Sequence, residues 1–320
     1  MSVAVCLLLY SFTVAVLGPR LLTRLTRAGV APRLGVVAWL VAIGSVVGSW
    51  ALTAAFLTGE LIRDWNQPGR AVASACLAML REVALGRDGA LVQVGLLMLT
   101  TVAVAAVAVV AWRLSRSLLR ARASTHEHAR MTRIAGRHID GLEAVVVDAP
   151  QRVAYCVPGR PNTIVVTSAA VSALDACHLD AVLSHERAHL VGRHHLILAL
   201  TGGLATILPR VELVTIGAAQ IARLLEMCAD DAAARTHGPA TVLGALLALS
   251  GAAPIPSSAL GATGVGVLAR ATRLATPPRP AQRIRVRLML AAVSTLLAIG
   301  PLLTVLLTAT GVAMCGPVIG

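Results

Sequence analysis

The residues His185, Glu186 and His189 have the types and the spacing of a zinc-binding segment. Two histidines four positions apart lie on one face of a helix, so both imidazoles can bind the same zinc ion. Glu186 lies between them, close enough to take a proton from a water on the metal. Zinc lowers the pKa of its water from about 15.7 to about 7, which provides hydroxide for attack on a carbonyl carbon. The segment therefore indicates amide hydrolysis, provided that a third ligand exists.

The third ligand has two candidates, which predict different classes of peptidase. His195 completes the spacing H-E-x-x-H-x-x-G-x-x-H, with Gly192 where a metzincin turns its chain. The helical pattern continues past Gly192, however, and on an unbroken helix His195 lies about 600° beyond His189 and points away from the metal. Glu226 on a separate helix is the gluzincin arrangement, and Asp230 one turn later can hydrogen-bond a ligating histidine. The pattern favours Glu226 and keeps His195 as the alternative.

The elements that must position these residues are short. Three valine-rich segments separated by turn residues predict a small strand meander over 141–148, 152–157 and 163–167. Ser172 and Asp175 resemble the two ends of a capping box. This capping box precedes a predicted helix over 178–196. A second helix is predicted over 221–235. The Gly- and Pro-rich residues 250–268 predict a loop.

Residues 196–209 are apolar but too short to span a bilayer comfortably, since a span needs about 20 residues. A single crossing there would separate Glu226 from His185 across the membrane. Zinc binding by both therefore predicts no crossing or two crossings between His195 and Ile221, with a bend at Pro209. A buried helix, a re-entrant segment and a hairpin all satisfy this condition.

The composition is that of a membrane protein. AVILMFWYC residues make up 57% of the 320 positions and charged residues only 13%, which excludes an ordinary soluble globule and a disordered chain. Four stretches are long and apolar enough to cross a bilayer, at about 1–17, 34–57, 90–112 and 288–312. The predicted organisation is a three-span part over 1–113, a soluble domain over 114–287, and a fourth span with a short tail over 288–320.

The charge distribution predicts the orientation. The formal charge is +13, and all 28 basic residues are arginines. Basic blocks follow the first and third spans and precede the fourth, so the positive-inside rule places 114–287 in the cytoplasm. The arginine runs indicate contact with lipid headgroups of the bilayer. Direct nucleic-acid binding is not expected, because aromatic residues for base stacking are only 2% of the chain.

Several motifs together resemble a known family. Tyr155-Cys-Val-Pro-Gly, Ile164-Val-Val-Thr-Ser, the segment from Leu179 to Leu190 around the paired histidines, and Glu226-Met-Cys-Ala-Asp230 resemble the BlaR/MecR-type membrane zinc metallopeptidases. They are also similar to the related HtpX and CAAX prenyl endopeptidase families. The resemblance implies a Zn²⁺ endopeptidase of the bacterial inner membrane, with His185, His189 and Glu226 as ligands, Glu186 as catalytic base and Asp230 behind the ligands.

The resemblance also suggests substrate contacts. The strand that carries Ala154 and Tyr155 can pair with an extended peptide through its main chain. Arg283 lies in a segment similar to the family's Thr-His-Pro-Pro…Arg-Ile motif, although the histidine is missing here. The extracellular penicillin-binding domain of the sensor members has no counterpart, so direct β-lactam sensing is not expected.

The predicted fold is therefore a membrane α-helical protein with four transmembrane helices and a cytoplasmic α+β gluzincin-type zinc metallopeptidase domain. The expected function is cleavage of a protein or peptide substrate at the cytoplasmic membrane surface, in regulated proteolysis of a repressor of the winged-helix type or in membrane protein quality control. A zinc-binding signalling or scaffold protein without proteolytic activity is the alternative. An intact Glu186 argues against it, because a structural zinc site needs no base.

Overall fold

The computed structural model describes residues 3–66, 89–138, 143–159, 161–250 and 263–314. The chain divides into two compact units. The first comprises Met1–Leu21, Leu40–Arg113 and Ala292–Gly320, and the second comprises Leu22–Trp39 and Leu114–Ala291. The second unit thus includes residues around the connector between the first two predicted spans, besides the whole of the domain predicted over 114–287.

Four described helices are long and apolar enough to cross a membrane. They are α1 (Val3–Thr26), α2 (Pro32–Asn66), α4 (Gly89–Ala135) and α11 (Pro280–Met314), with the qualifying stretches Val3–Thr26, Pro32–Gly59, Leu97–Leu119 and Pro280–Thr308. Each of the four predicted spans overlaps one of these stretches. Large apolar side chains such as Phe12 and Leu302 are exposed on them, as on surfaces that face lipid. These apolar helices indicate a membrane protein.

Within the first unit, polar side chains link the apolar helices. Tyr10 of α1 donates its hydroxyl hydrogen to the carbonyl of Leu297 in α11 at 3.0 Å. The indole N–H of Trp50 in α2 donates to the hydroxyl of Ser11 in α1 at 3.2 Å. Hydrogen bonds between helices satisfy groups that would be costly to leave unpaired in hydrocarbon.

The second unit contains a four-stranded sheet in the order β1-β2-β4-β3. It is built from β1 (Arg137–His138), β2 (Val145–Val147), β3 (Ala154–Val157) and β4 (Thr163–Thr167). β2 pairs with β4 in parallel, and β3 pairs with β4 antiparallel. The predicted meander is therefore wrong in its strand order. Every residue of β4 is buried, so this strand takes an interior position, and the partly buried β3 lies at the edge of the described sheet.

The helix that carries the paired histidines, α6 (Ala176–Val191), begins at Asp175. The Asp175 carboxylate accepts the main-chain N–H of His178 at 2.8 Å, so Asp175 itself is the N-cap. The predicted capping box is wrong, because Ser172 belongs to the preceding short helix α5 (Ser168–Ala173). Leu183 of α6 packs with Ile164 and Val166 of β4. This contact fixes α6 against the sheet.

α6 ends at a sharp bend before α7 (His194–Ile207). The two helices differ in direction by 62°. Gly192 caps α6, and Arg193 adopts a left-handed conformation with φ of 49°, which no helix interior accommodates. The predicted unbroken helix over 178–196 is therefore wrong.

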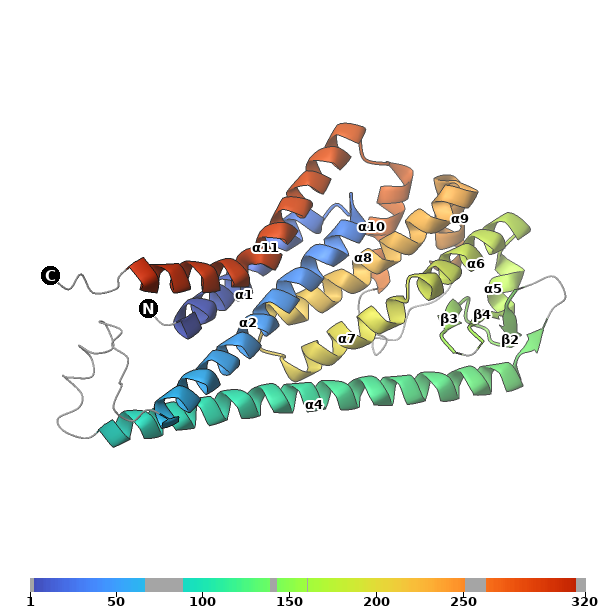
Figure 1. The fold of residues 1–320 in the computed structure, drawn as a ribbon. Coiled ribbons are helices and arrows are strands. Elements are labelled where there is room, and N and C mark those ends of the chain that lie inside the picture. The colour runs from blue at the N-terminus through green and yellow to red at the C-terminus, as the bar shows by residue number, and fades with distance from the viewer. Residues whose placement is uncertain (1–2, 67–88, 139–142, 160, 251–262, 315–320) are drawn as a thin grey trace. The chain divides into compact units, whose positions relative to one another are not determined.

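After α7 the chain turns at Pro209 and continues into α8 (Glu212–His237), which carries Glu226. α7 and α8 pack against each other, so this part of the chain is a helical hairpin, one of the predicted alternatives. α8 also lies along α6 (Figure 1). It begins nine residues earlier than predicted, at Glu212 rather than at residue 221.

The second unit also contains the helices α9 (Pro239–Ser250) and α10 (Thr263–Ala275). The loop predicted over 250–268 is wrong for its last six residues, which belong to α10; residues 251–262 lie outside the described part of the chain. Buried Leu274 of α10 packs with Ala181, Ala233 and Val242 of α6, α8 and α9. This cluster holds α10 beside α8.

Candidate metal centre

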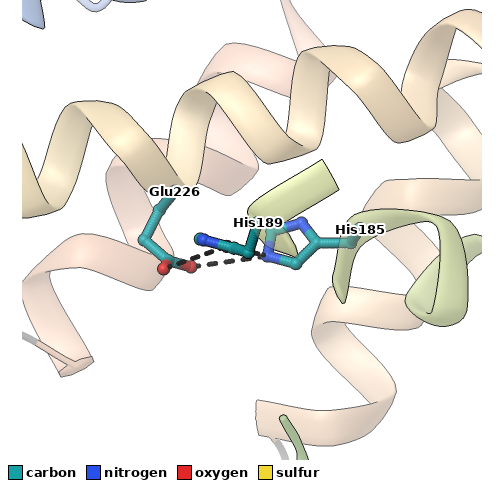
Figure 2. Close-up of side chains that lie close together, drawn as sticks. All are labelled: His185, His189 and Glu226. Atoms are coloured by element: carbon teal, nitrogen blue, oxygen red, sulfur yellow. Dashed lines mark hydrogen bonds and ion pairs between the residues drawn. The ribbon is translucent and has the colours of Figure 1, made fainter. Parts of the chain in front are cut away.

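Three side chains from two helices form a group that could hold a metal ion. One nitrogen each of His185 and His189 and a carboxylate oxygen of Glu226 all lie within 4.8 Å of one another. The two Nε2 atoms are 3.2 Å apart. The Nε2 atom of His185 lies 3.5 Å from one Glu226 oxygen, and that of His189 lies 3.4 Å from the other. Figure 2 shows both imidazoles turned toward the carboxylate.

These residues fit a zinc ion. Two imidazole nitrogens and one carboxylate oxygen form a ligand set of catalytic zinc sites, which keep the fourth position open. In a tetrahedral site with bonds of about 2.0–2.1 Å, neighbouring ligand atoms lie about 3.3 Å apart. The separations of 3.2 to 3.5 Å between these side chains match that spacing.

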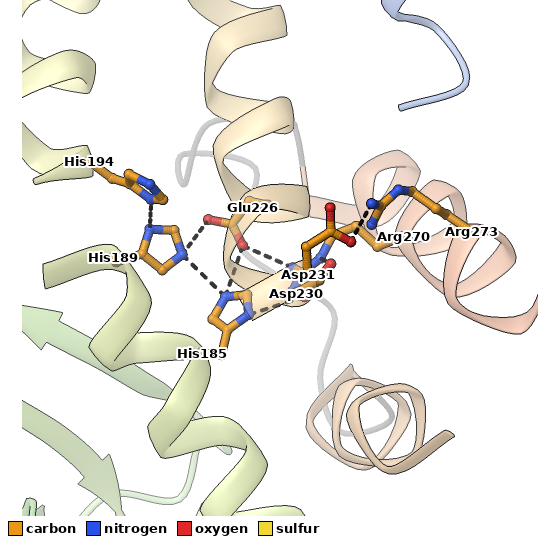
Figure 3. Close-up of polar contacts among 8 residues, drawn as sticks. All are labelled: His185, His189, His194, Glu226, Asp230, Asp231, Arg270 and Arg273. Carbon is orange, nitrogen blue, oxygen red and sulfur yellow. Dashed lines mark hydrogen bonds and ion pairs between the residues drawn. The ribbon is translucent and has the colours of Figure 1, made fainter. Parts of the chain in front are cut away.

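Asp230 lies directly behind His185. Its carboxylate oxygen is 3.1 Å from the Nδ1 atom of His185, and its side chain is fully buried. This contact orients the imidazole so that Nε2 points toward Glu226 (Figure 3). Burial alone would raise the pKa of Asp230, but hydrogen bonds from Arg270 and His185 lower that pKa to about 2.

Arg270 of α10 bridges the two carboxylates of α8. It donates from Nε and Nη2 to the two oxygens of Asp230 at 2.8 and 2.7 Å, and its Nη1 lies 3.0 Å from Glu226. Burial would raise the pKa of Glu226, yet its hydrogen bond with His185 and the charge of Arg270 lower that pKa to about 2. Arg270 thus keeps both carboxylates ionised.

Sequence reasoning missed Arg270. The residue lies 40 positions after Asp230, beyond a Gly- and Pro-rich segment, and no motif marks it. The signal that could have found it is the spacing of Arg270 and Arg273, which places both on one face of a helix against the adjacent acids Asp230 and Asp231. Arg273 does pair with Asp231, and it also donates to the carbonyl of Gly29 at 2.8 Å.

His194 contacts the second histidine of the group. The bend after α6 brings its Nδ1 atom within 2.9 Å of Nδ1 of His189, with the two rings edge to face. Figure 3 shows His194 on the side of His189 that faces away from Glu226. His195, the alternative ligand, is not part of the described group. Because of the bend, it is His194, the residue before His195, that approaches this group. His194 contacts the ligand His189 and does not face the proposed metal position.

Glu186 projects from α6 toward the edge strand. α6 packs against β3, and the Glu186 carboxyl group lies close enough to Cys156 of this strand for the two side chains to interact electrostatically. Burial raises the pKa of Glu186 to about 7, and burial likewise raises the pKa of the Cys156 thiol to about 12. A carboxyl group with a pKa near neutrality can both accept and return a proton.

The remaining predicted site residues lie on β3 and α11. Ala154 and Tyr155 are on β3, next to Cys156 and so on the strand that Glu186 contacts. Arg283 is exposed in the first turn of α11, and no ion pair joins it to the metal-ligand group among the residues that the structure describes. The predicted substrate contact of Arg283 stays a prediction, and the arginine that contacts the metal-ligand group is Arg270.

A half-buried His-His-Glu group beside a second glutamate is the arrangement of a metal-dependent hydrolase. Residues 118–250 match the model of peptidase family M48. The matched region contains both histidines, Glu186, Glu226 and Asp230, so the part of the chain that carries the candidate site is similar to this metallopeptidase family. No curated protein and no solved structure matches the chain. The finer resemblance to the BlaR/MecR and HtpX groups therefore stays a prediction.

Proposed function

We propose that this protein is a zinc-dependent endopeptidase of the gluzincin type that cleaves a protein substrate at the cytoplasmic surface of a membrane. The observation that carries the proposal is the convergence of His185, His189 and Glu226, with Glu186 one residue from the first ligand. The M48 family match and the apolar helices support the same function.

His185, His189 and Glu226 would hold the zinc ion, and Asp230 and His194 would orient the two imidazoles from behind. Zinc, when bound, supplies Lewis acidity that activates water and polarises a carbonyl group. Glu186 accepts the proton of the attacking water and returns it to the leaving amine. The positive charge of a bound metal would lower the pKa of Glu186 from its metal-free value of about 7, which favours the basic form.

The edge of β3 supports a role in substrate binding. The N–H of Thr167 in β4 donates to the carbonyl of Val153 at 3.0 Å. In an antiparallel pair the main-chain groups of alternate residues point away from the partner strand, so those of Ala154 and Cys156 face the open edge. An extended peptide could pair with them as an added strand. Glu186 contacts Cys156 at this edge, so a peptide bound there would lie beside the base.

The test is proteolysis by purified full-length protein with zinc, with zinc removed by a chelator, and by the variant Glu186→Gln. We expect Glu186→Gln to retain stoichiometric zinc and to lose at least about 100-fold in turnover of casein, because general-base catalysis contributes 10²–10⁴-fold. Glu143→Gln is a matched control, since Glu143 is an exposed glutamate that forms an ion pair with Arg187 and belongs to no metal-ligand group among the residues that the structure describes. Undiminished cleavage by Glu186→Gln would refute the assigned base. A zinc-loaded protein that never cleaves would favour the signalling or scaffold function.

A further inference from the structure

We propose that a cavity in the second unit, beside the metal centre, binds the phosphate headgroup of an anionic membrane lipid. The cavity has a volume of about 440 Å³ and is lined by residues of α2, α6, α7 and α8. This volume lies in the range of small-molecule sites, about 300–1,000 Å³. The proposal concerns binding and does not depend on the peptidase function.

Three arginines from three helices line the cavity: Arg33 of α2, Arg187 of α6 and Arg235 of α8. Among the described residues, no acidic side chain lines the cavity. Arg187 pairs with Glu143, whereas Arg33 and Arg235 are exposed and form no ion pair within the part of the chain that the structure describes. Guanidinium groups bind phosphate through planar, paired hydrogen bonds. The cavity therefore has the charge to bind a phosphate group.

The remaining wall is largely apolar. It includes Val36, Val191, Ile197 and Leu225. Val191, at the end of α6, has 79% of its surface exposed. Exposed leucines follow along α7 from this wall, at Leu196, Leu198 and Leu200. A ligand with a phosphate at one end and hydrocarbon at the other matches this arrangement better than a free phosphate or an acidic peptide.

The position of Arg33 favours a lipid as well. A stretch apolar enough to cross a membrane begins at Pro32, so Arg33 stands at its first turn. Arginines at the ends of membrane helices lie at the level of the headgroups. The bent pair of α6 and α7, which lines the same cavity, is also apolar enough for a broken membrane span or a re-entrant loop. Both features place the cavity where headgroups are concentrated.

His194 connects the cavity to the metal centre. Its Nδ1 atom contacts His189. Its Nε2 atom lies against Gly192, where an added Cβ would be 2.4 Å away, and both residues line the cavity. A headgroup bound here would therefore lie one side chain from a proposed zinc ligand.

The test is a titration of the full-length protein in detergent with phosphatidylglycerol, with bound lipid counted by native mass spectrometry. We expect one retained lipid, and we expect the double substitution Arg33→Gln and Arg235→Gln to weaken binding roughly 25-fold, about fivefold for each arginine at a membrane surface. The control, Arg210→Gln with Arg279→Gln, removes the same charge outside the cavity; Arg279 also directly precedes a candidate membrane stretch. Unchanged zinc content and thermal unfolding verify the fold.

Two further arms distinguish other ligands. Phosphatidylcholine should bind much more weakly, because its headgroup has no net charge, and inorganic phosphate at constant ionic strength should displace little phosphatidylglycerol. Equal weakening by the cavity variant and the control would overturn the proposal in favour of general surface attraction. Displacement of the lipid by inorganic phosphate would overturn the proposal in favour of a soluble phosphate ligand. Binding of an acidic peptide more tightly than phosphatidylglycerol would overturn it in favour of a protein partner.

Discussion

The Nδ1 atom of His185 lies 3.1 Å from a carboxylate oxygen of Asp230, a side chain with no exposed surface. The contact joins α6 to α8 directly behind the proposed metal position. It also fixes which nitrogen of His185 is available to the metal, because the carboxylate retains the proton on Nδ1 and leaves Nε2 to face Glu226.

Asp230→Asn should weaken zinc binding about 10- to 100-fold, the usual effect of losing a partner behind a ligand. The amide keeps the shape of the carboxylate but removes the charge that orients His185 and pairs with Arg270. Competition with a chromophoric chelator measures the affinity. Asp231→Asn is the matched control, since the neighbouring carboxylate pairs with Arg273. Equal affinity of the Asp230 variant and the wild-type protein would contradict the orienting role.

Arg270→Gln should destabilise the metal-free protein more than the zinc-loaded protein. Removing one partner of a buried ion pair costs about 3–5 kcal/mol, because the other charge remains buried. Bound zinc would compensate part of this cost by neutralising Glu226, which lies 3.0 Å from Arg270. Thermal unfolding with and without zinc measures the difference. Arg152→Gln is the control and should change both values little, because this exposed arginine donates to the carbonyl of Ala248 at 3.3 Å rather than to a buried carboxylate. Equal destabilisation in both states would disprove the electrostatic account.

The sequence predicts those parts of the metal centre whose residues are close together in the chain, and it misses those that depend on contacts between distant segments. His185, Glu186 and His189 are contiguous, so one helical period predicts their common face. Glu226 and Asp230 lie on another helix. They are predicted because zinc needs a third ligand and because Asp230 follows Glu226 by one helical turn. Arg270 could not be found in this way, because only the packing of Leu274 against α6, α8 and α9 brings α10 to the acids. Long-range packing leaves no local pattern.

The bend at Gly192 and the sheet order show the same limit. Residues 193–196 continue the helical pattern, and only the left-handed Arg193 reveals the break. Valine-rich segments predict the strands, but the parallel pairing of β2 with β4 depends on which strand is buried on both faces. Sequence periodicity therefore locates elements better than it determines their neighbours.

Zinc affinity should fall as pH is lowered below about 9. Burial alone would lower the pKa of His185, but its hydrogen bonds with Asp230 and Glu226 outweigh this effect and raise the pKa to about 9 in the metal-free protein. Zinc must displace that proton, so the apparent affinity should drop up to about tenfold for each pH unit below 9. Burial lowers the pKa of His189 to about 4, so protonation of this ligand adds a further loss only below that pH.

The same raised pKa has the opposite effect on the metal-free fold. Protonated His185 stabilises the folded state below the unfolded pKa of about 6.5. This contribution is lost as pH rises toward about 9. Metal-free protein should therefore unfold at lower temperature at pH 9 than at pH 6.5, while zinc binding becomes tighter. Calorimetry with and without chelator measures both trends, and a parallel pH dependence of the two would contradict the assignment.

Gly192→Ala should weaken zinc binding, although φ at Gly192 is −74° and suits any residue. An added Cβ would lie 2.4 Å from Nε2 of His194 and 3.0 Å from the carbonyl of Ala188, so the His194 ring must leave its contact with His189. We expect a loss of about tenfold in affinity, at the lower limit for a partner behind a ligand. Gly202→Ala is the control, because its Cβ meets nothing within 4 Å inside α7 and should stabilise the helix by about 0.5–1 kcal/mol. If both variants bound zinc with the affinity of the wild-type protein, the contact with His194 would not be needed to orient His189.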